Sequence, residues 1–140
     1  MKLANLIIFL FLFISGAAIA GTSSQEHTGH VMNPEMKKQH ETMATIVKQW
    51  KVCKNAIKDN NLKDAELAVE TIIEAAADID SFRLHKNADK QEQFAKQCNV
   101  FRENILKLKD EIKRRDTDAA KNFSIKIEEN CKQCHSTFRK

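Results

Sequence analysis

The chain has 140 residues, enough for one domain, and carries 23 Lys and Arg against 19 Asp and Glu, a net charge of +4. This positive charge is too mild and too evenly mixed to indicate a nucleic-acid-binding protein, although it suits weak docking onto an acidic partner. With only 3 Gly, 1 Pro and no Tyr, and with abundant Ala, Lys, Glu, Ile and Leu, the composition is typical of an all-helical protein.

Residues 1–20 have the pattern of an export signal peptide. Lys2 supplies a positive start, the apolar run LIIFLFLFISG follows, and AIA before Gly21 predicts cleavage after Ala20. The apolar run is shorter than the ~20 residues that span a bilayer, so a retained membrane anchor is less favoured. Export predicts an oxidising compartment, which in a bacterium is the periplasm. Cleavage removes one Lys and no acid and leaves a charge of 22 − 19 = +3, with no second apolar run to hold the chain in a membrane.

Residues 21–32 are small and polar, and we expect a flexible N-terminal segment there. His27 and His30 stand three apart and could bind a metal, but such a pair more often belongs to a solvated tail. The folded domain is therefore expected over residues 33–140.

A first helix is predicted from Pro34 to about residue 58. Asn33 suits the N-cap, Pro34 the first helical position and Glu35 the positive end of the helix dipole. The sequence DNN at 59–61 ends the helix. We expect Trp50 to belong to the core, because it lies well beyond the level predicted for the site at the end of the chain. The apolar and soft residues with helical spacing are Met36, Met43, Ile46, Val47, Trp50, Cys53 and Ile57.

Two further helices follow. The second is predicted from residue 62 to about residue 81, and the sequence RLHKN is expected to be a loop. Asn87 or Asp89 can cap the third helix, and Asp89 with Glu92 has the spacing of a capping box. The inward residues of helix three recur in steps of 4, 3, 4, 3 and 4, a rhythm suited to bundle packing. These residues are Phe94, Cys98, Phe101, Ile105, Leu108 and Ile112.

A fourth helix is predicted from about Thr117 to the end of the chain, after a basic and acidic junction, KRRDTD, that can cap both helices. Four amphipathic helices joined by short connectors predict an all-α fold, an antiparallel up-down-up-down four-helix bundle. The residues of helix four expected to face inward are Ala120, Phe123, Ile127, Cys131 and Cys134.

The last helix ends in CKQCHSTFRK, which contains the haem-attachment pattern CxxCH. Cys131 and Cys134 lie on adjacent turns of one helix face, where both thiols can add to the vinyl groups of one haem. His135 can then turn its imidazole to the iron as the proximal ligand. The pattern predicts one haem c bound through Cys131 and Cys134, and export agrees with this, because such haem is attached outside the cytoplasm.

The sequence gives less support to other roles for the two cysteines. A thioredoxin-like CxxC normally opens a helix beside a strand, and no strand is predicted here. A zinc site needs a fourth ligand, and no residue nearby has suitable spacing. A disulfide between residues three apart on a helix would be strained.

The tail CKQCHSTFRK, at the end of a four-helix chain of this length, resembles the cytochrome c′ family, including its low-spin methionine-ligated relatives. The resemblance implies that Cys131 and Cys134 hold haem and that His135 is the proximal ligand. The sequence FR after the motif also matches, which implies that Arg139 lies beside His135 near the haem edge. The alternative for Arg139 is a solvated charge at a frayed end.

The distal side of the haem is expected to come from helix one. If helices one and four are antiparallel neighbours, the first two or three turns of helix one face His135. Met36, His40 and Met43 lie on one face of those turns, and each could ligate or crowd the iron. The family pattern in this region matches KKQHETM in spacing and implies Met43 at the distal position, although Gln39 and His40 stand where Arg and Gln are usual.

Phe94 and Phe101, with Phe123, are expected to form apolar walls of the haem site or of the core. Cys53 and Cys98 fall on inward faces of helices one and three. Their expected offset of roughly 15 Å along the bundle exceeds the ~7 Å that a disulfide allows between Cα atoms, which favours two buried free thiols. A shift in either predicted helix start would reopen the disulfide.

These residues predict a periplasmic mono-haem c-type cytochrome that transfers single electrons, with Met43 as the leading distal ligand and His40 or Met36 as alternatives. The second hypothesis is a five-coordinate protein that binds or scavenges NO or CO. Enzymatic turnover, such as peroxidase activity, has weak support, so the chain is expected not to be an enzyme. The expected partners are a redox protein, which the mild positive charge favours being acidic, and, by resemblance, a second copy bound through helices one and two.

Overall fold

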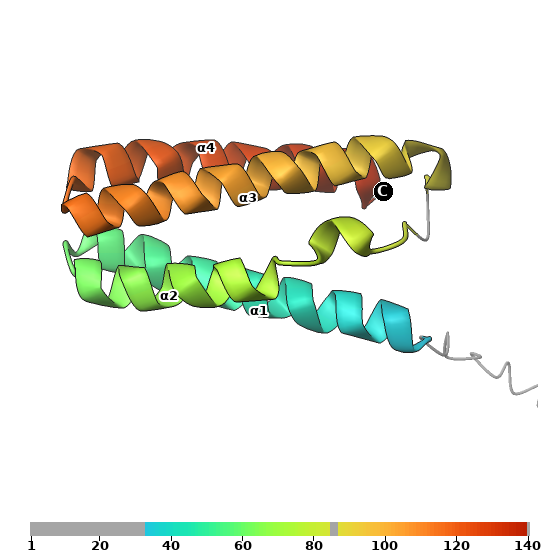
Figure 1. The fold of residues 1–140 in the computed structure, drawn as a ribbon, viewed down its shortest axis with the longest axis horizontal. Helices are drawn as coiled ribbons and strands as arrows, with labels where there is room; N and C mark the ends of the chain where they lie inside the picture. The colour runs from blue at the N-terminus through green and yellow to red at the C-terminus, as the bar shows by residue number, and fades with distance from the viewer. Residues whose placement is uncertain (1–32, 85–86, 140) are drawn as a thin grey trace, which may run out of the picture. The chain divides into compact units, whose positions relative to one another are not determined.

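The structure is a computed structural model that describes residues 33–84 and 87–139. The predicted signal peptide and the segment with His27 and His30 lie outside the described residues. Over the described ranges the chain is helical and contains no strand, which confirms the predicted all-α class (Figure 1). The elements are α1 (Pro34–Lys58), α2 (Leu62–Ala75), the 3-10 helices η1 (Ile79–Ser81) and η2 (Ala88–Lys90), α3 (Gln91–Arg114) and α4 (Thr117–Phe138). None of the helices in the described ranges is long and apolar enough to cross a bilayer.

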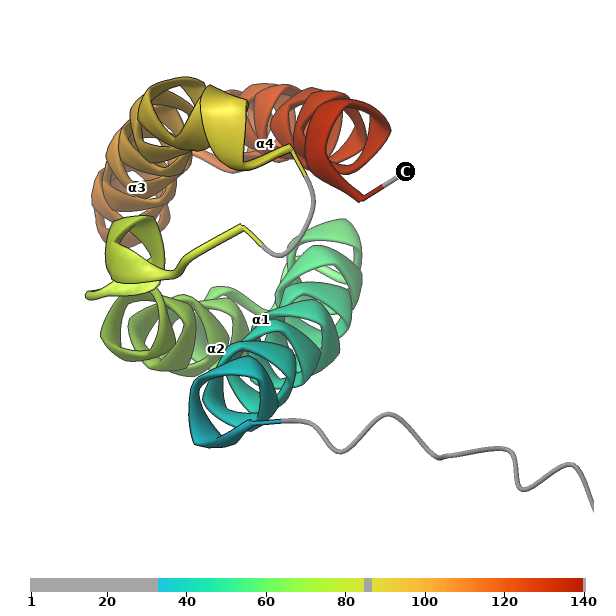
Figure 2. The same cartoon turned by 90° about the vertical axis from the view of Figure 1, so that its right-hand side faces the viewer.

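The four α-helices pack as a bundle. α1 lies along α2 and α3 lies along α4, while α2 also packs against α3 and the contact between α1 and α4 is the slightest of the four (Figure 2). One apolar core runs through all four helices, and its most deeply buried large side chains are Ile72, Ile105, Leu108, Ile112 and Ile127. The weak α1–α4 contact leaves one side of the bundle less tightly closed than the others.

The sequence patterns that predicted inward residues are largely confirmed. The α3 positions predicted to face inward are buried, apart from Phe101, which is half-buried against the core. In α1 the pattern was wrong at Val47, whose side chain is 48% exposed. A valine on the edge of an apolar helix face stays exposed when the neighbouring helix does not pack closely over it, and here that neighbour is α4.

Two predicted helix starts are confirmed by their caps. The Asn33 side chain accepts a hydrogen bond from the backbone N–H of Met36 at 2.8 Å, and Pro34 occupies the first turn of α1. The Asp116 carboxylate accepts from the backbone N–H of Ala119 at 2.9 Å and caps α4. Each cap satisfies a backbone donor that the first helical turn leaves free.

The α1–α2 and α3–α4 turns lie together. Asn60 and Arg115 each adopt a left-handed conformation, with φ of 56° and 61°, which ends the preceding helix and redirects the chain. The Thr117 hydroxyl donates to the Asn60 side-chain oxygen at 2.8 Å and ties the two turns to each other. This contact places the end of α1 beside the start of α4.

The connection between α2 and α3 differs from the prediction. α2 ends at Ala75 rather than near residue 81, and the chain continues through η1. The predicted capping box at Asp89 is wrong, because Asp89 belongs to η2 and α3 starts at Gln91. Lys90 occupies the N-cap position of α3, and its side chain makes no capping hydrogen bond. The Gln91 side chain instead bonds the connector, donating to the carbonyl of Phe82 at 2.9 Å and accepting from the backbone N–H of Leu84 at 3.1 Å.

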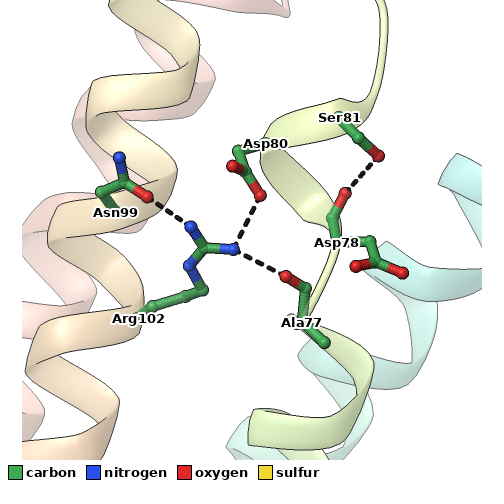
Figure 3. Close-up of polar contacts among 6 residues, drawn as sticks. All are labelled: Ala77, Asp78, Asp80, Ser81, Asn99 and Arg102. Carbon is green, nitrogen blue, oxygen red and sulfur yellow. Dashed lines mark hydrogen bonds and ion pairs between the residues drawn. The ribbon is translucent and has the colours of Figure 1, made fainter.

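Arg102 of α3 fixes the start of this connector (Figure 3). Its guanidinium donates to the carbonyl of Ala77 at 2.6 Å and to the carboxylate of Asp80 at 2.7 Å, and a further bond reaches the side-chain oxygen of Asn99. The Ala77 carbonyl lies just beyond the end of α2, where helix carbonyls lack partners. Ile79, which is buried, is thereby held against the core between two anchored residues.

Replacing Arg102 with Met should lower the free energy of unfolding by about 2 kcal/mol, because it removes charge-assisted hydrogen bonds and leaves a half-buried carboxylate and a carbonyl unpaired. Urea unfolding followed by circular dichroism measures the change. Arg114→Met is the matched control, since the Arg114 side chain is 71% exposed and pairs only with Glu111 on its own helix. Equal effects of the two substitutions would mean that the connector is not held by Arg102.

Candidate functional site

A pocket with about 890 Å³ of space free of protein atoms, part of which is open solvent, lies near the end of α4. Its lining is mostly apolar and comes from α1, η1, α3 and α4. The exposed lining residues Val47, Lys132 and His135 belong to α1 and α4, so the pocket opens between these two helices. The lining residues are Met43, Ile46, Val47, Trp50, Ile79, Phe94, Gln97, Cys98, Phe101, Glu128, Asn130, Cys131, Lys132, Cys134 and His135.

The whole CxxCH motif borders this pocket. Cys131 and Cys134 are half-buried with their side chains against the core, whereas His135 is exposed at the opening. Burial raises the pKa of both thiols, with Cys134 adding to the effect on Cys131. The residue as a whole is exposed, but partial burial of the imidazole, and secondly the nearby positive charge of Arg139, lower the pKa of His135. Its imidazole is therefore biased toward the neutral form, which is the form that binds a metal.

Of the three predicted distal residues, the structure brings only Met43 to the pocket. Met43 is half-buried and packs against the core, on the same pocket wall as Ile46. His40 is exposed and Met36 is half-buried nearer the start of α1, and neither side chain lines the pocket. Arg139 is exposed, follows the end of α4 and does not line the pocket either.

Phe94 and Phe101 line the pocket from α3, as predicted. Phe94 is buried and meets Phe138 of α4 edge-to-face, with ring centroids 5.4 Å apart and planes at 85°. This pair packs the last turn of α4 against α3. Phe123 is half-buried and lies away from the pocket, where the ammonium of Lys126 sits 4.7 Å from its ring centre.

Trp50 is a site residue that the sequence did not reveal. Its side chain is only 9% exposed and lines the pocket beside Cys131. The indole Nε1–H has no hydrogen-bond partner among the described residues. Trp50 was predicted to lie beyond the site on the expectation that α4 ends at the level where α1 begins. No sequence pattern in α1 or α4 reveals how far the two helices are offset along the bundle. The residues of α1 that lie opposite the motif could therefore not be predicted from the sequence.

A second feature absent from the sequence prediction is a buried amide network next to the motif. The Asn130 side chain, 6% exposed, donates to the Gln97 side-chain oxygen at 2.9 Å and accepts from the Asn104 amide at 3.3 Å. Both partners belong to α3. The bonds fix the rotation of α4 against α3 immediately before Cys131, and so help to direct both motif thiols toward the pocket.

Cys53 and Cys98 are buried free thiols, as the sequence favoured, and Cys131 and Cys134 are also free. Burial raises the pKa of Cys53 and of Cys98 to about 12, and Cys134 adds to the effect on Cys98. Cys98 lines the pocket from α3. Within residues 33–84 and 87–139, no three His, Cys, Asp or Glu residues gather closely enough to hold a bare metal ion.

The ion pair between Lys54 and Glu128 joins α1 to α4 at the inner end of the pocket opening. Lys54 lowers the pKa of Glu128 through a hydrogen bond and its charge, and the Trp50 indole contributes less. The indole does not reach a well-formed hydrogen bond, so Lys54 is the effective partner. Because the α1–α4 contact is otherwise slight, this pair is a main polar link across the seam between these helices.

Glu128→Gln should lower the free energy of unfolding at pH 7 by about 0.5–1 kcal/mol, a range set by solvent screening of a side chain that is 40% exposed. A carboxyl whose pKa is lowered by folding stabilises the protein above its unfolded pKa, and this stability is lost as the pH falls through the folded pKa. The difference between wild type and variant should therefore vanish in acid. Urea unfolding from pH 7 to pH 3 measures it, with Glu92→Gln, in an exposed pair within α3, as control. A difference that does not change with pH would contradict a stabilising ion pair between Glu128 and Lys54.

Comparisons with protein-family models, with curated proteins and with solved structures found no match to this chain. The resemblance to cytochrome c′ therefore depends on the motif and on its position in the last of four helices.

Proposed function

We propose that the protein is an exported mono-haem c-type cytochrome that carries single electrons. The observation that carries the proposal is that both thiols and the histidine of CxxCH border one mostly apolar pocket. Cys131 and Cys134 would hold the porphyrin through thioether bonds, and His135 would ligate its iron. When bound, the haem supplies the one-electron Fe(III)/Fe(II) couple, and the protein supplies binding, orientation and exclusion of water.

The pocket is suitable for a haem in chemistry. Its lining is mostly apolar with a few polar groups, which is the usual character of cofactor pockets. Ile46 and Phe94 provide buried apolar walls on two different helices, and Ile79 closes a third side from the connector. The partnerless Trp50 indole N–H adds a polar donor that a bound group or an ordered water can satisfy.

We further infer the up-down-up-down order of the helices. Only three residues, 59–61, separate α1 from α2, and two residues separate α3 from α4, which favours antiparallel neighbours. The hydrogen bond between Thr117 and Asn60 is consistent with this order, because it joins the end of α1 to the start of α4. The same order would bring the last turns of α4 beside the first half of α1.

Met43 is the best-supported distal ligand, because it is the one predicted candidate that lines the pocket. A methionine thioether opposite His135 would favour the ferrous iron and raise the reduction potential, which suits an electron carrier. The alternative is an iron with an open distal side that binds NO or CO. The pocket opening between α1 and α4 is the observation that supports this alternative, since it offers a small ligand a route from solvent.

A homodimer through helices one and two also has physical support. Val52 of α1 and Leu67 of α2 expose 44% and 58% of their surfaces. Both border one shallow hollow on the outer face of the α1–α2 pair. Exposed apolar side chains gathered on one face are typical of a contact with another protein surface.

Expression in a bacterium that exports the chain and attaches haem should give a mature polypeptide heavier by the mass of one haem. Mass spectrometry of the denatured protein measures the covalent addition. Cys131→Ser combined with Cys134→Ser should abolish it, because neither thioether can form. Cys53→Ser combined with Cys98→Ser is the control and should keep the added mass. A wild-type chain without it would overturn the proposed function.

Met43→Ala should convert a low-spin absorption spectrum to a high-spin one, because the iron loses its sixth ligand. The weak long-wavelength band of ferric iron bound to methionine should disappear, and the sharp reduced bands should broaden. His40→Ala is the matched control, since His40 is exposed and outside the pocket lining. If Met43→Ala leaves the wild-type spectrum unchanged, and that spectrum is high-spin, the open-iron alternative is favoured.

A further inference from the structure

The exposed side of α1 next to α4 is basic. From residue 42 to residue 58, α1 contains four lysines and no acidic residue. Val47, Lys51, Lys54 and Lys58 recur at intervals of four, three and four residues, which places them along one side of the helix. Lys54 reaches Glu128, so this side faces the seam between α1 and α4.

A matching row follows α4. Lys121, Ile125, Glu128 and Lys132 are spaced by four, three and four residues, and Arg139 continues the row at the end of the helix. Glu128 pairs with Lys54, and Lys132 borders the pocket opening. We call the two rows together the α1–α4 basic face, made of Val47, Lys51, Lys54, Lys58, Lys121, Ile125, Glu128, Lys132 and Arg139.

The positive charge of this face is largely uncompensated within the described part of the chain. Its single acidic residue, Glu128, is taken by Lys54. Lys51, Lys58 and Lys132 are exposed and form no ion pair with any described residue. Lys121 has only an exposed pair at 3.4 Å with Asp118 of its own helix.

The helix on the other side of α1, α2, is acidic. α2 carries one basic residue, Lys63, against Asp64, Glu66, Glu70 and Glu74. The charge is therefore unevenly distributed between α1 and α2, although the net charge of the chain is small. Such asymmetry orients a molecule during diffusional encounter and raises association rates with a partner of complementary charge.

Two exposed apolar side chains belong to the basic face. Val47 lies at the pocket opening and is 48% exposed, and Ile125 of α4 is 57% exposed. Apolar contact surrounded by charged groups is the usual composition of a transient protein interface, in which the rim charges direct encounter and the apolar centre excludes water. A polyanion or a lipid surface would use the charges but not this arrangement around the pocket opening.

We propose that the α1–α4 basic face is the docking surface for an acidic redox protein, whose carboxylates pair with Lys51, Lys58, Lys121 and Lys132 around the pocket opening. This inference rests on the proposed function in one respect, which is that electron transfer at the contact requires a haem in the pocket. Docking here would bring the partner to the nearest edge of that pocket. The charge and exposure of the face are properties of the chain itself.

The test measures binding of a small acidic plant-type ferredoxin, used as the probe, by isothermal titration calorimetry with the mature protein. Binding should be detectable near 0.01 M salt, where the Debye length is about 30 Å, and should weaken strongly at 0.15 M, where it is about 8 Å. Lys51→Glu combined with Lys121→Glu, one change on each row, should weaken binding at low salt by at least about fivefold.

The matched control is Lys63→Glu combined with Lys107→Glu, which changes the net charge equally on α2 and α3 at exposed positions. It should change the dissociation constant by less than about twofold. Equal weakening by both double variants would overturn the proposal, because only net charge would then matter. Thermal melts followed by circular dichroism check that both variants keep the fold.

Vesicles containing phosphatidylserine test the other source of negative charge. If they bind the protein at 0.15 M salt through the same lysines, while the ferredoxin shows no dependence on the α1–α4 basic face, the face is a lipid-binding surface and the proposal fails. The calorimetric readout does not require haem. Face-dependent binding by a chain that carries no haem would therefore sustain the docking surface and reject the proposed function.

Discussion

The site depends on the slight contact between α1 and α4. Three of the four neighbouring helix pairs close tightly, and the fourth opens near the end of α4, which is where the pocket and the CxxCH motif lie. The Lys54–Glu128 ion pair limits this opening at its inner end. A fully packed seam would bury the motif thiols in the core, and an unlinked seam would expose the apolar walls to water. The pocket exists because neither extreme is reached.

Polar anchors hold the other walls of the pocket in position. Arg102 binds the connector after α2 and thereby holds Ile79 against the pocket. Asn130 binds Gln97 and Asn104 of α3 and sets the rotation of the motif. Buried or half-buried polar groups of this kind specify one arrangement among many that apolar packing alone would tolerate. The preorganised pocket that our proposal requires therefore depends on contacts made by residues outside the motif.

Local patterns predicted the elements and much of the core. The helix starts at Asn33 and Asp116 could be predicted because a cap depends only on neighbouring residues. The buried positions of α3 could be predicted because burial follows the spacing of apolar residues along a helix. The two motif cysteines were predicted to belong to the site from their spacing alone, and both line the pocket.

The missed features are those that depend on distant contacts. The stagger of α1 against α4 decides that Trp50 lies in the pocket and that His40 does not, and it results from packing between residues that are far apart in the chain. The end of α2 at Ala75 and the failed capping box at Asp89 likewise follow from tertiary bonds of Arg102 and Gln91. Val47 was misassigned because a helical repeat does not reveal how closely the next helix approaches.

The two additional cysteines have a consequence for maturation of the chain. Only a thiolate attacks a disulfide or an electrophile, and at neutral pH a thiol with a pKa of about 12 is almost never ionised, as holds for Cys53 and Cys98. Once folded, the bundle thus keeps two of its four thiols chemically unreactive. Wrong disulfides formed by Cys53 or Cys98 in an oxidising compartment would then be confined to the interval before the helices assemble.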